Sequence, residues 1–210
     1  MNKHLSLLTA ALLLTGASSA FAASQTDLTV TGTITPVACE PTLANGGVVN
    51  YGKISVQDLR ETEHTPLGIE TIQLTVSCDE AAQFAISTTD NQKDTYSGSG
   101  DWNFGLGLIN GNEKLGLYRL AVLNPVADVP VTTMRSRDKG NTWAPTNNQM
   151  SFRDDWVAFG NQTGGIWTPA FVQNVAMDIE LKTYIAPTKD LTLTDDVNLN
   201  GSATLQIEYL

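Results

Sequence analysis

Alternation of apolar and polar residues is the dominant pattern along the chain. It is strictest at the C-terminus, over Ala203–Tyr209, and it recurs over residues 28–34 with threonine at the polar positions. Successive side chains of a strand point to opposite faces, so this period of two residues predicts strands with one buried face. Further strands are predicted over residues 71–78, 83–88, 104–109, 115–122, 156–159 and 175–185.

Glycine and asparagine clusters separate the predicted strands and supply the backbone angles that tight turns need. No segment has the period of a helix longer than two or three turns. Short strands joined by such turns predict an all-β fold, and a sandwich of two sheets is favoured over a barrel. The polar stretch 125–148 contains three prolines and is interpreted as a long surface excursion.

Residues 1–22 have the pattern of a secretory signal peptide. Lys3 and His4 precede an apolar run over residues 5–14, and Ala20-Phe21-Ala22 resembles a signal-peptidase cleavage site. The run is shorter than the roughly 20 apolar residues that a membrane-spanning helix needs. We therefore expect an exported protein without a membrane span, whose mature chain begins near Ala23 and forms one domain.

Two cysteines, Cys39 and Cys78, lie in the exported part of the chain. These two cysteines lack C-x-x-C spacing and have no neighbouring histidine. In an oxidising compartment this predicts a disulfide between them rather than a redox or metal site. Closing a loop of this length stabilises a fold by about 4 kcal/mol in the chain-entropy model.

The acidic composition argues against nucleic acid as a partner. The chain has 12 lysines and arginines against 22 aspartates and glutamates, a formal net charge of −10, so a phosphate backbone is repelled. Removal of the signal peptide takes away one lysine and makes the charge more negative.

Candidate catalytic and metal-binding residues are few. His64 is the only histidine after the signal peptide, and an extended backbone points it away from Glu61 and Glu63, which favours a solvated loop over a metal site. The sequence has no nucleophile-elbow motif and no phosphate-binding glycine loop. We expect no enzymatic activity, no metal and no cofactor.

Three tryptophans in predicted loops are candidate ligand-binding residues: Trp102, Trp143 and Trp167. Exposed indole rings can stack on sugar rings, whereas anchoring of a loop or core is the commoner role of tryptophan. Both interpretations stay open at this point.

Both ends of the mature chain resemble the chaperone-usher pilus subunits of Gram-negative bacteria. The resemblance is carried by the alternating segment 28–34 before Cys39, by Cys78 39 residues later, and by the C-terminal alternating strand with penultimate Tyr209. A softer match is Phe-Gly-Leu-Gly-Leu-Ile-Asn-Gly over residues 104–111. Residues 125–170 are longer than the common pilin pattern.

The resemblance implies an immunoglobulin-like, pilin-type β-sandwich that lacks one strand and is completed by a donor strand. It divides the chain into a signal peptide (1–22), a donor-strand extension (23–37) and a pilin-like domain (38–210). A periplasmic chaperone would first fill the groove, and the extension of a neighbouring subunit would replace it at the outer-membrane usher by β-strand addition.

The resemblance also assigns residues to the two partners of this exchange. Leu28, Val30 and Ile34 would enter a neighbour's groove, and Gly32 would be the small donor residue opposite a shallow pocket. The alternative for Gly32 is a bulge glycine in an ordinary first strand.

The acceptor groove would be lined by one face of the C-terminal strand, namely Ala203, Leu205, Ile207 and Tyr209. The chaperone would bind the carboxylate of Leu210. The alternative is that this strand is a simple edge strand of a closed sandwich.

The function implied is that of a structural subunit of a pilus, exported through the periplasm to a fimbrium at the cell surface, where it supports adhesion. The alternatives are a tip-associated adhesin and an extracellular carbohydrate-binding sandwich that uses the tryptophans.

The predicted disulfide can be measured directly on protein purified from the periplasm. Reduction should raise the mass of the intact mature chain by two hydrogens, because one bond between Cys39 and Cys78 is broken. Two free thiols in the unreduced protein would contradict the prediction.

Overall fold

The chain divides into two units, Met1–Ile34 and Thr35–Leu210, each described by itself. The computed structural model describes residues 28–31 of the first unit and residues 38–100, 102–146 and 155–210 of the second. Residues 28–31 are exposed and belong to no strand, so this part of the predicted N-terminal strand is not formed in the single chain. The signal peptide, Gly32, Ile34 and the predicted boundary at residue 37 lie outside the described residues.

The second unit consists of strands and short 3-10 turns, and no α-helix occurs among its described residues. Its strands are β1 (Cys39–Leu43), β2 (Thr65–Ala82), β3 (Phe84–Asp90), β4 (Phe104–Gly105), β5 (Leu108–Ile109), β6 (Glu113–Lys114), β7 (Gly116–Ala127), β8 (Thr132–Ser136), β9 (Ala144–Pro145), β10 (Trp156–Thr163), β11 (Ile166–Pro169), β12 (Val172–Ile185) and β13 (Ala203–Tyr209). The 3-10 turns are η1 (Ala44–Gly47), η2 (Val56–Asp58) and η3 (Thr188–Asp190). The predicted all-β class is confirmed, and the described part of the chain offers no helix long and apolar enough to cross a membrane.

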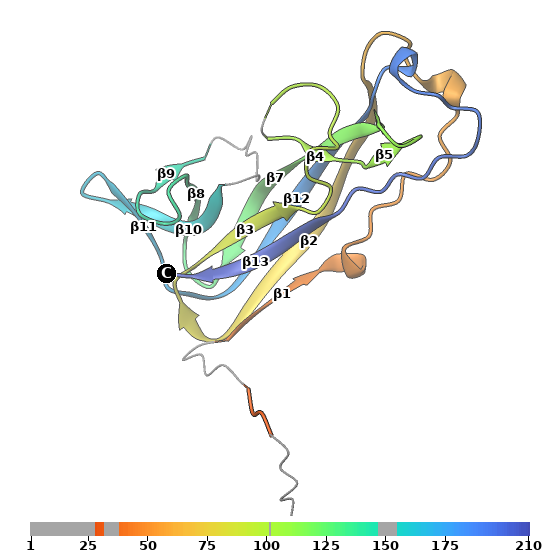
Figure 1. Ribbon diagram of the computed structural model, residues 1–210. Helices are drawn as coiled ribbons and strands as arrows, with labels where there is room; N and C mark the ends of the chain where they lie inside the picture. The colour runs from red at the N-terminus through yellow and green to blue at the C-terminus, as the bar shows by residue number, and fades with distance from the viewer. Residues whose placement is uncertain (1–27, 32–37, 101, 147–154) are drawn as a thin grey trace, which may run out of the picture. The chain divides into compact units, whose positions relative to one another are not determined.

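The strands form two antiparallel sheets that enclose a common core (Figure 1). The first sheet, sheet A, has the order β1-β2-β12-β7-β4, and the second, sheet B, has the order β13-β3-β10-β8-β9, with β11 paired to β10. Strands β5 and β6 form a separate short hairpin. The first and last strands of the unit, β1 and β13, are therefore end strands of different sheets.

Alternation along the central strands explains how the core forms. Val175, Met177 and Ile179 of β12 point into the space between the sheets and are buried. From sheet B, Phe84 and Phe159 meet edge to face at 6.4 Å in the same cluster. Side chains from both larger sheets therefore belong to one hydrophobic cluster.

The interpretation of residues 125–148 as a surface excursion is wrong. Strands β8 and β9 lie within this stretch and extend sheet B, and Met134 of β8 is fully buried. The prolines misled the prediction because Pro145 occupies the end strand β9, and Pro125 falls where the pairing of β7 with β12 shifts register. Proline is tolerated at both kinds of position, since no ladder hydrogen bond is lost there.

Strands β3, β8, β10 and β11 contribute to a second, smaller hydrophobic cluster on the outer face of sheet B. Its buried residues are Met134, Ala85 and Ala158, which pair across three adjacent strands. Half-buried tryptophans pack over them, namely Trp143, Trp156 and Trp167. Sheet B is thus covered on both faces where these strands lie.

The strand predicted over residues 104–109 is divided into β4 and β5. Gly107 lies between them with a φ of 90°, a left-handed conformation that only glycine adopts readily. The chain changes direction there, so β4 pairs with β7 while β5 pairs with β6.

The shared core predicts a large cost for removing Phe159. Phe159→Ala should lower the free energy of unfolding by about 3–5 kcal/mol, because the surrounding side chains of both sheets cannot fill the cavity. Ile166→Ala is the control, since Ile166 is 70% exposed, and it should change the value by less than about 0.5 kcal/mol. Urea unfolding measures both, and equal losses would contradict this description of the core.

Candidate functional site

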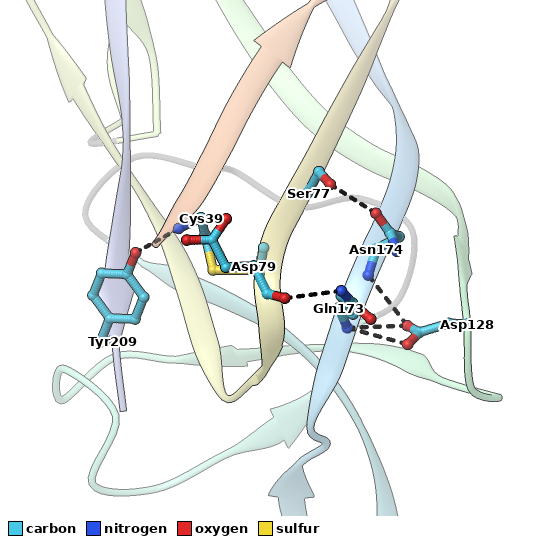
Figure 2. The surroundings of a disulfide bond; sticks show 8 residues. Cys39, Ser77, Asp79, Asp128, Gln173, Asn174 and Tyr209 are labelled. Carbon is cyan, nitrogen blue, oxygen red and sulfur yellow. Dashed lines mark hydrogen bonds between the residues drawn. A yellow bond between two sulfur atoms is a disulfide. The ribbon is translucent and has the colours of Figure 1, made fainter. Parts of the chain in front are cut away.

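The inner edges of β1 and β13 face each other without pairing. In the described part of the chain, β1 pairs as a strand only with β2, and β13 only with β3. The two strands meet at one end, where the backbone N–H of Cys39 donates to the hydroxyl oxygen of Tyr209 at 2.8 Å (Figure 2). The two strands are therefore joined at this end and are not paired with each other along the rest of their length.

The predicted disulfide between Cys39 and Cys78 is present and attaches the start of β1 to β2. The two cysteines stand opposite each other in the register of the β1–β2 pair. A five-residue strand paired on only one side has few contacts of its own, so the covalent link keeps β1 in place. A disulfide also indicates an oxidising compartment, in agreement with export.

A hollow of about 250 Å³ lies between β1 and β13 and reaches the main core. Its floor is formed by inward residues of sheet A, including Ile72, Leu120, Ile179 and Leu181, and its walls by Leu43 and Leu205 from the two end strands. An apolar cavity of about 150 Å³ already holds a benzene molecule, so this hollow has room for more than one aliphatic side chain. We call the hollow and its two bordering strands the β1–β13 groove.

The structure places three of the four predicted acceptor residues against the groove or the core beside it. Ala203 and Leu205 line the hollow, and Ile207 is half-buried against the main core. Tyr209 lies on the same face of β13 but is 46% exposed, and its hydroxyl reaches Cys39. Tyr209 thus marks the end of the groove rather than its lining.

Sequence reasoning missed a polar pair in this apolar surface. Thr183 of β12 faces the groove floor and is 2% exposed, and its Oγ1 accepts a hydrogen bond from the hydroxyl of Tyr51 at 2.9 Å. Burial raises the pKa of Tyr51 above its ordinary value, and the nearby Glu70 carboxylate raises it further, against the lowering effect of the bond to Thr183. The signal for Thr183 was readable, because it is a polar residue in the inward series of β12, whereas no pattern pointed to Tyr51.

Side chains at the joined end of the groove hold β12 against β2 and the β7–β8 loop. Both carboxylate oxygens of Asp128 accept the backbone N–H of Gln173, and one also accepts that of Asn174 (Figure 2). Gln173 donates through Nε2 to the backbone oxygen of Asp79, and Ser77 donates to Oδ1 of Asn174. These bonds satisfy backbone groups at the register shift in β12, so their role is structural.

The three tryptophans proposed as ligand-binding residues do not form one surface. Trp143 and Trp167 pack over the second cluster on sheet B, which gives both a structural role. Trp102 is 44% exposed and lies near Arg119 of β7, whose guanidinium carbon is 6.0 Å from its ring centre.

His64 is engaged by a serine rather than by the neighbouring glutamates. Its Nε2 lies 2.9 Å from Oγ of Ser97, while Glu63 pairs with Arg60 at 3.4 Å. Among the residues that the structure describes, no group of three or more histidine, cysteine, aspartate or glutamate side chains could hold a metal ion.

A hydrogen-bonded loop between β8 and β9 lies against the C-terminal residue at the end of β13. A Cβ atom added to Gly140 would be 3.2 Å from a methyl group of Leu210. Ser136 donates to the carboxylate of Asp138 at 2.6 Å and accepts from the N–H of Gly140, and Thr142 donates twice to Asp138. These bonds lower the pKa of Asp138 to about 2, with Ser136 the largest contributor.

Comparison with known proteins shows similarity without a described activity. A family model described as "protein of unknown function (DUF1120)" matches residues 28–112, a stretch that includes the alternating segment 28–34 and both cysteines. Among curated proteins of Escherichia coli (strain K12), the chain is 28% identical over 231 residues to the uncharacterized protein YhcF, covering 92% of this chain and 94% of YhcF. It is 24% identical over 245 residues to protein GltF, covering 95% of each.

The pKa of Asp138 predicts an acid-sensitive loop beside Leu210. Because the folded pKa lies below the ordinary value of 3.8, ionised Asp138 stabilises the fold above that pH, and this contribution is lost as the pH falls towards about 2. NMR titration of the carboxyl carbon measures the pKa, and exchange of the Thr142 amide hydrogen should accelerate over the same range. In Asp138→Asn the Thr142 amide should show no such transition. A midpoint near 3.8 in the wild type would contradict the prediction.

Proposed function

We propose that this chain is an exported structural subunit of a chaperone-usher pilus that polymerises by β-strand addition. Residues 24–37 of one copy would fill the β1–β13 groove of the next. The observation that carries the proposal is the apolar groove between β1 and β13, whose facing edges pair with no strand among the described residues. The N-terminal segment of the same chain has the alternating pattern of a strand that could fill this groove.

The groove suits an extended strand with side chains on one face. Two bordering strands with free edges offer backbone hydrogen bonds, and the apolar hollow between them takes alternate side chains. In residues 24–37, Leu28, Val30 and Ile34 fall on one face. Burial of each would contribute roughly 2 kcal/mol, reduced by the entropy lost when the strand becomes ordered.

The strand order supports an incomplete immunoglobulin-like sandwich. β1 and β13 border the position that a further strand would occupy, and each lies at the end of its sheet on the same side of the unit (Figure 1). An exposed apolar edge pairs readily with other chains. A periplasmic chaperone would cover this edge before assembly, and the outer-membrane usher would be the place of exchange.

The exposure of the donor residues is consistent with this role. Leu28 and Val30 are among the most exposed large apolar side chains of the described residues. Alternating apolar side chains are typical of a strand with one buried face, and in the isolated chain Leu28 and Val30 are not buried. Insertion into a second copy would bury them.

The proposal is tested by substitution of Gly32, the predicted small donor residue. Gly32→Asn should slow polymerisation by roughly 10-fold, because a larger side chain must be forced into a shallow part of the groove. Thr33→Asn is the matched control, since residue 33 points to the opposite face of an extended donor strand, and it should leave the rate unchanged.

Size-exclusion chromatography of the mature protein, sampled after its release from a chaperone, follows the reaction. Wild-type protein should form ordered multimers, and a chain without residues 23–37 should form none by itself. Normal polymerisation of Gly32→Asn would overturn the assignment of Gly32. Stable monomers of both the full chain and the shortened chain would overturn the proposed function.

A further inference from the structure

Residues 48–55, between η1 and η2, border the β1–β13 groove and form a segment that we call the strap. They belong to no strand, and residues 49–54 make no backbone–backbone hydrogen bond to another described residue. Val49, Tyr51 and Ile54 turn towards apolar surroundings and are half-buried. The strap is therefore held in place by side chains rather than by a sheet.

The strap separates the β1–β13 groove from a second hollow of about 440 Å³. The two hollows share three lining residues, namely Val49, Tyr51 and Leu199. The second hollow continues between the strap and residues 193–199, with Ile185 and Leu115 among its lining residues. Tyr51 thus stands at the partition between the two hollows, of which the second is lined by both apolar and polar side chains.

Tyr51 is the residue that ties the strap to the sandwich. Its hydroxyl donates to Thr183 at 2.9 Å, and Thr183 belongs to the central strand β12 of sheet A. A buried hydroxyl without a partner costs about 1–3 kcal/mol, so this bond disfavours an open strap as long as nothing else reaches Thr183. Gly52, the next residue after Tyr51, has a φ of 67°. This is a left-handed backbone conformation that glycine adopts readily, and it lies next to the residue that bonds Thr183.

The length of the proposed donor strand brings it to Tyr51. The apolar positions Leu28 to Ile34 span six residues, or roughly 20 Å of strand. Tyr209 closes the joined end of the groove, so the inward positions that remain along β13 are Ala203 to Ile207, which span four residues, or roughly 13 Å. A strand that buries its whole apolar face alongside β13 must therefore extend past Ala203 towards Leu199, which is where Tyr51 lies.

We infer that the bond from Tyr51 to Thr183 is a latch that closes the far part of the groove until a donor strand displaces the strap. The inference rests on the proposed function, because the strand that opens the latch is residues 24–37 of a second copy. The latch slows strand entry and shields the apolar lining residues at the far part of the β1–β13 groove in the unfilled subunit.

The rate of strand entry tests the latch. The acceptor is the full mature chain with Val30→Asp and Ile34→Asp, which disable its own donor segment, and the probe is a fluorescent synthetic peptide of residues 24–37. Tyr51→Phe and Thr183→Val should each raise the association rate by roughly 2- to 10-fold, as expected when one hydrogen bond is lost. Fluorescence anisotropy records the association.

Tyr184→Phe is the matched control. Tyr184 neighbours Thr183 on β12, but its ring stacks near Arg119 at 5.6 Å on the other face of the sheet. Loss of its hydroxyl should leave the association rate unchanged. A general loosening of the fold would appear as faster association in the control as well and would contradict a specific latch.

The possible outcomes separate the latch from the proposed function. Equal association rates for the unsubstituted acceptor, Tyr51→Phe and Thr183→Val would overturn the latch and leave strand addition standing. Slower association of Tyr51→Phe would also overturn it, because the hydroxyl would then assist the bound state. Failure of every acceptor to bind the peptide would overturn the proposed function and the latch together.

Discussion

Apolar side chains of the main core remain open to solvent between β1 and β13, because neither strand hydrogen-bonds to the other along its length. A protein interior normally contains few voids larger than a water molecule, so a hollow of about 250 Å³ is a place where folding has left packing incomplete. The features around it follow from this constraint. The disulfide holds the short strand β1, and the contact from Cys39 to Tyr209 closes one end.

The remainder of the sandwich is packed tightly enough to keep the open side in shape. Sheet A runs its longest strands, β2 and β12, beneath the groove as a continuous floor. Sheet B is reinforced on its outer face, where tryptophans cover Met134. In this account the two packed sheets hold the β1–β13 groove open, and the strap with Tyr51 partly shields the groove from solvent. Assembly would then draw its free energy from completing the core.

Much of the fold could be predicted from alternation, because β12 and β13 each bury one face and expose the other. The paired cysteines were predictable for a similar reason, since a secreted chain with two cysteines has one possible pairing. Strand β9 was missed because it is a two-residue end strand that contains Pro145, and β8 was missed because its five residues carry only a weak alternating pattern. The bond between Tyr51 and Thr183 joins residues 132 positions apart, and no local pattern reports such a contact.

The central claim is that residues near Val30 of one copy occupy the groove beside Leu205 of another. The most direct measurement mixes a Val30→Cys copy with a Leu205→Cys copy, each with its native disulfide intact, and detects interchain disulfides under mild oxidation. The account predicts a covalent pair with Leu205→Cys, or with its inward neighbours Ala203→Cys and Ile207→Cys. Gln206→Cys, on the opposite face of the same strand, should form none. Equal yields at Leu205 and Gln206, or no interchain product at any position, would contradict it.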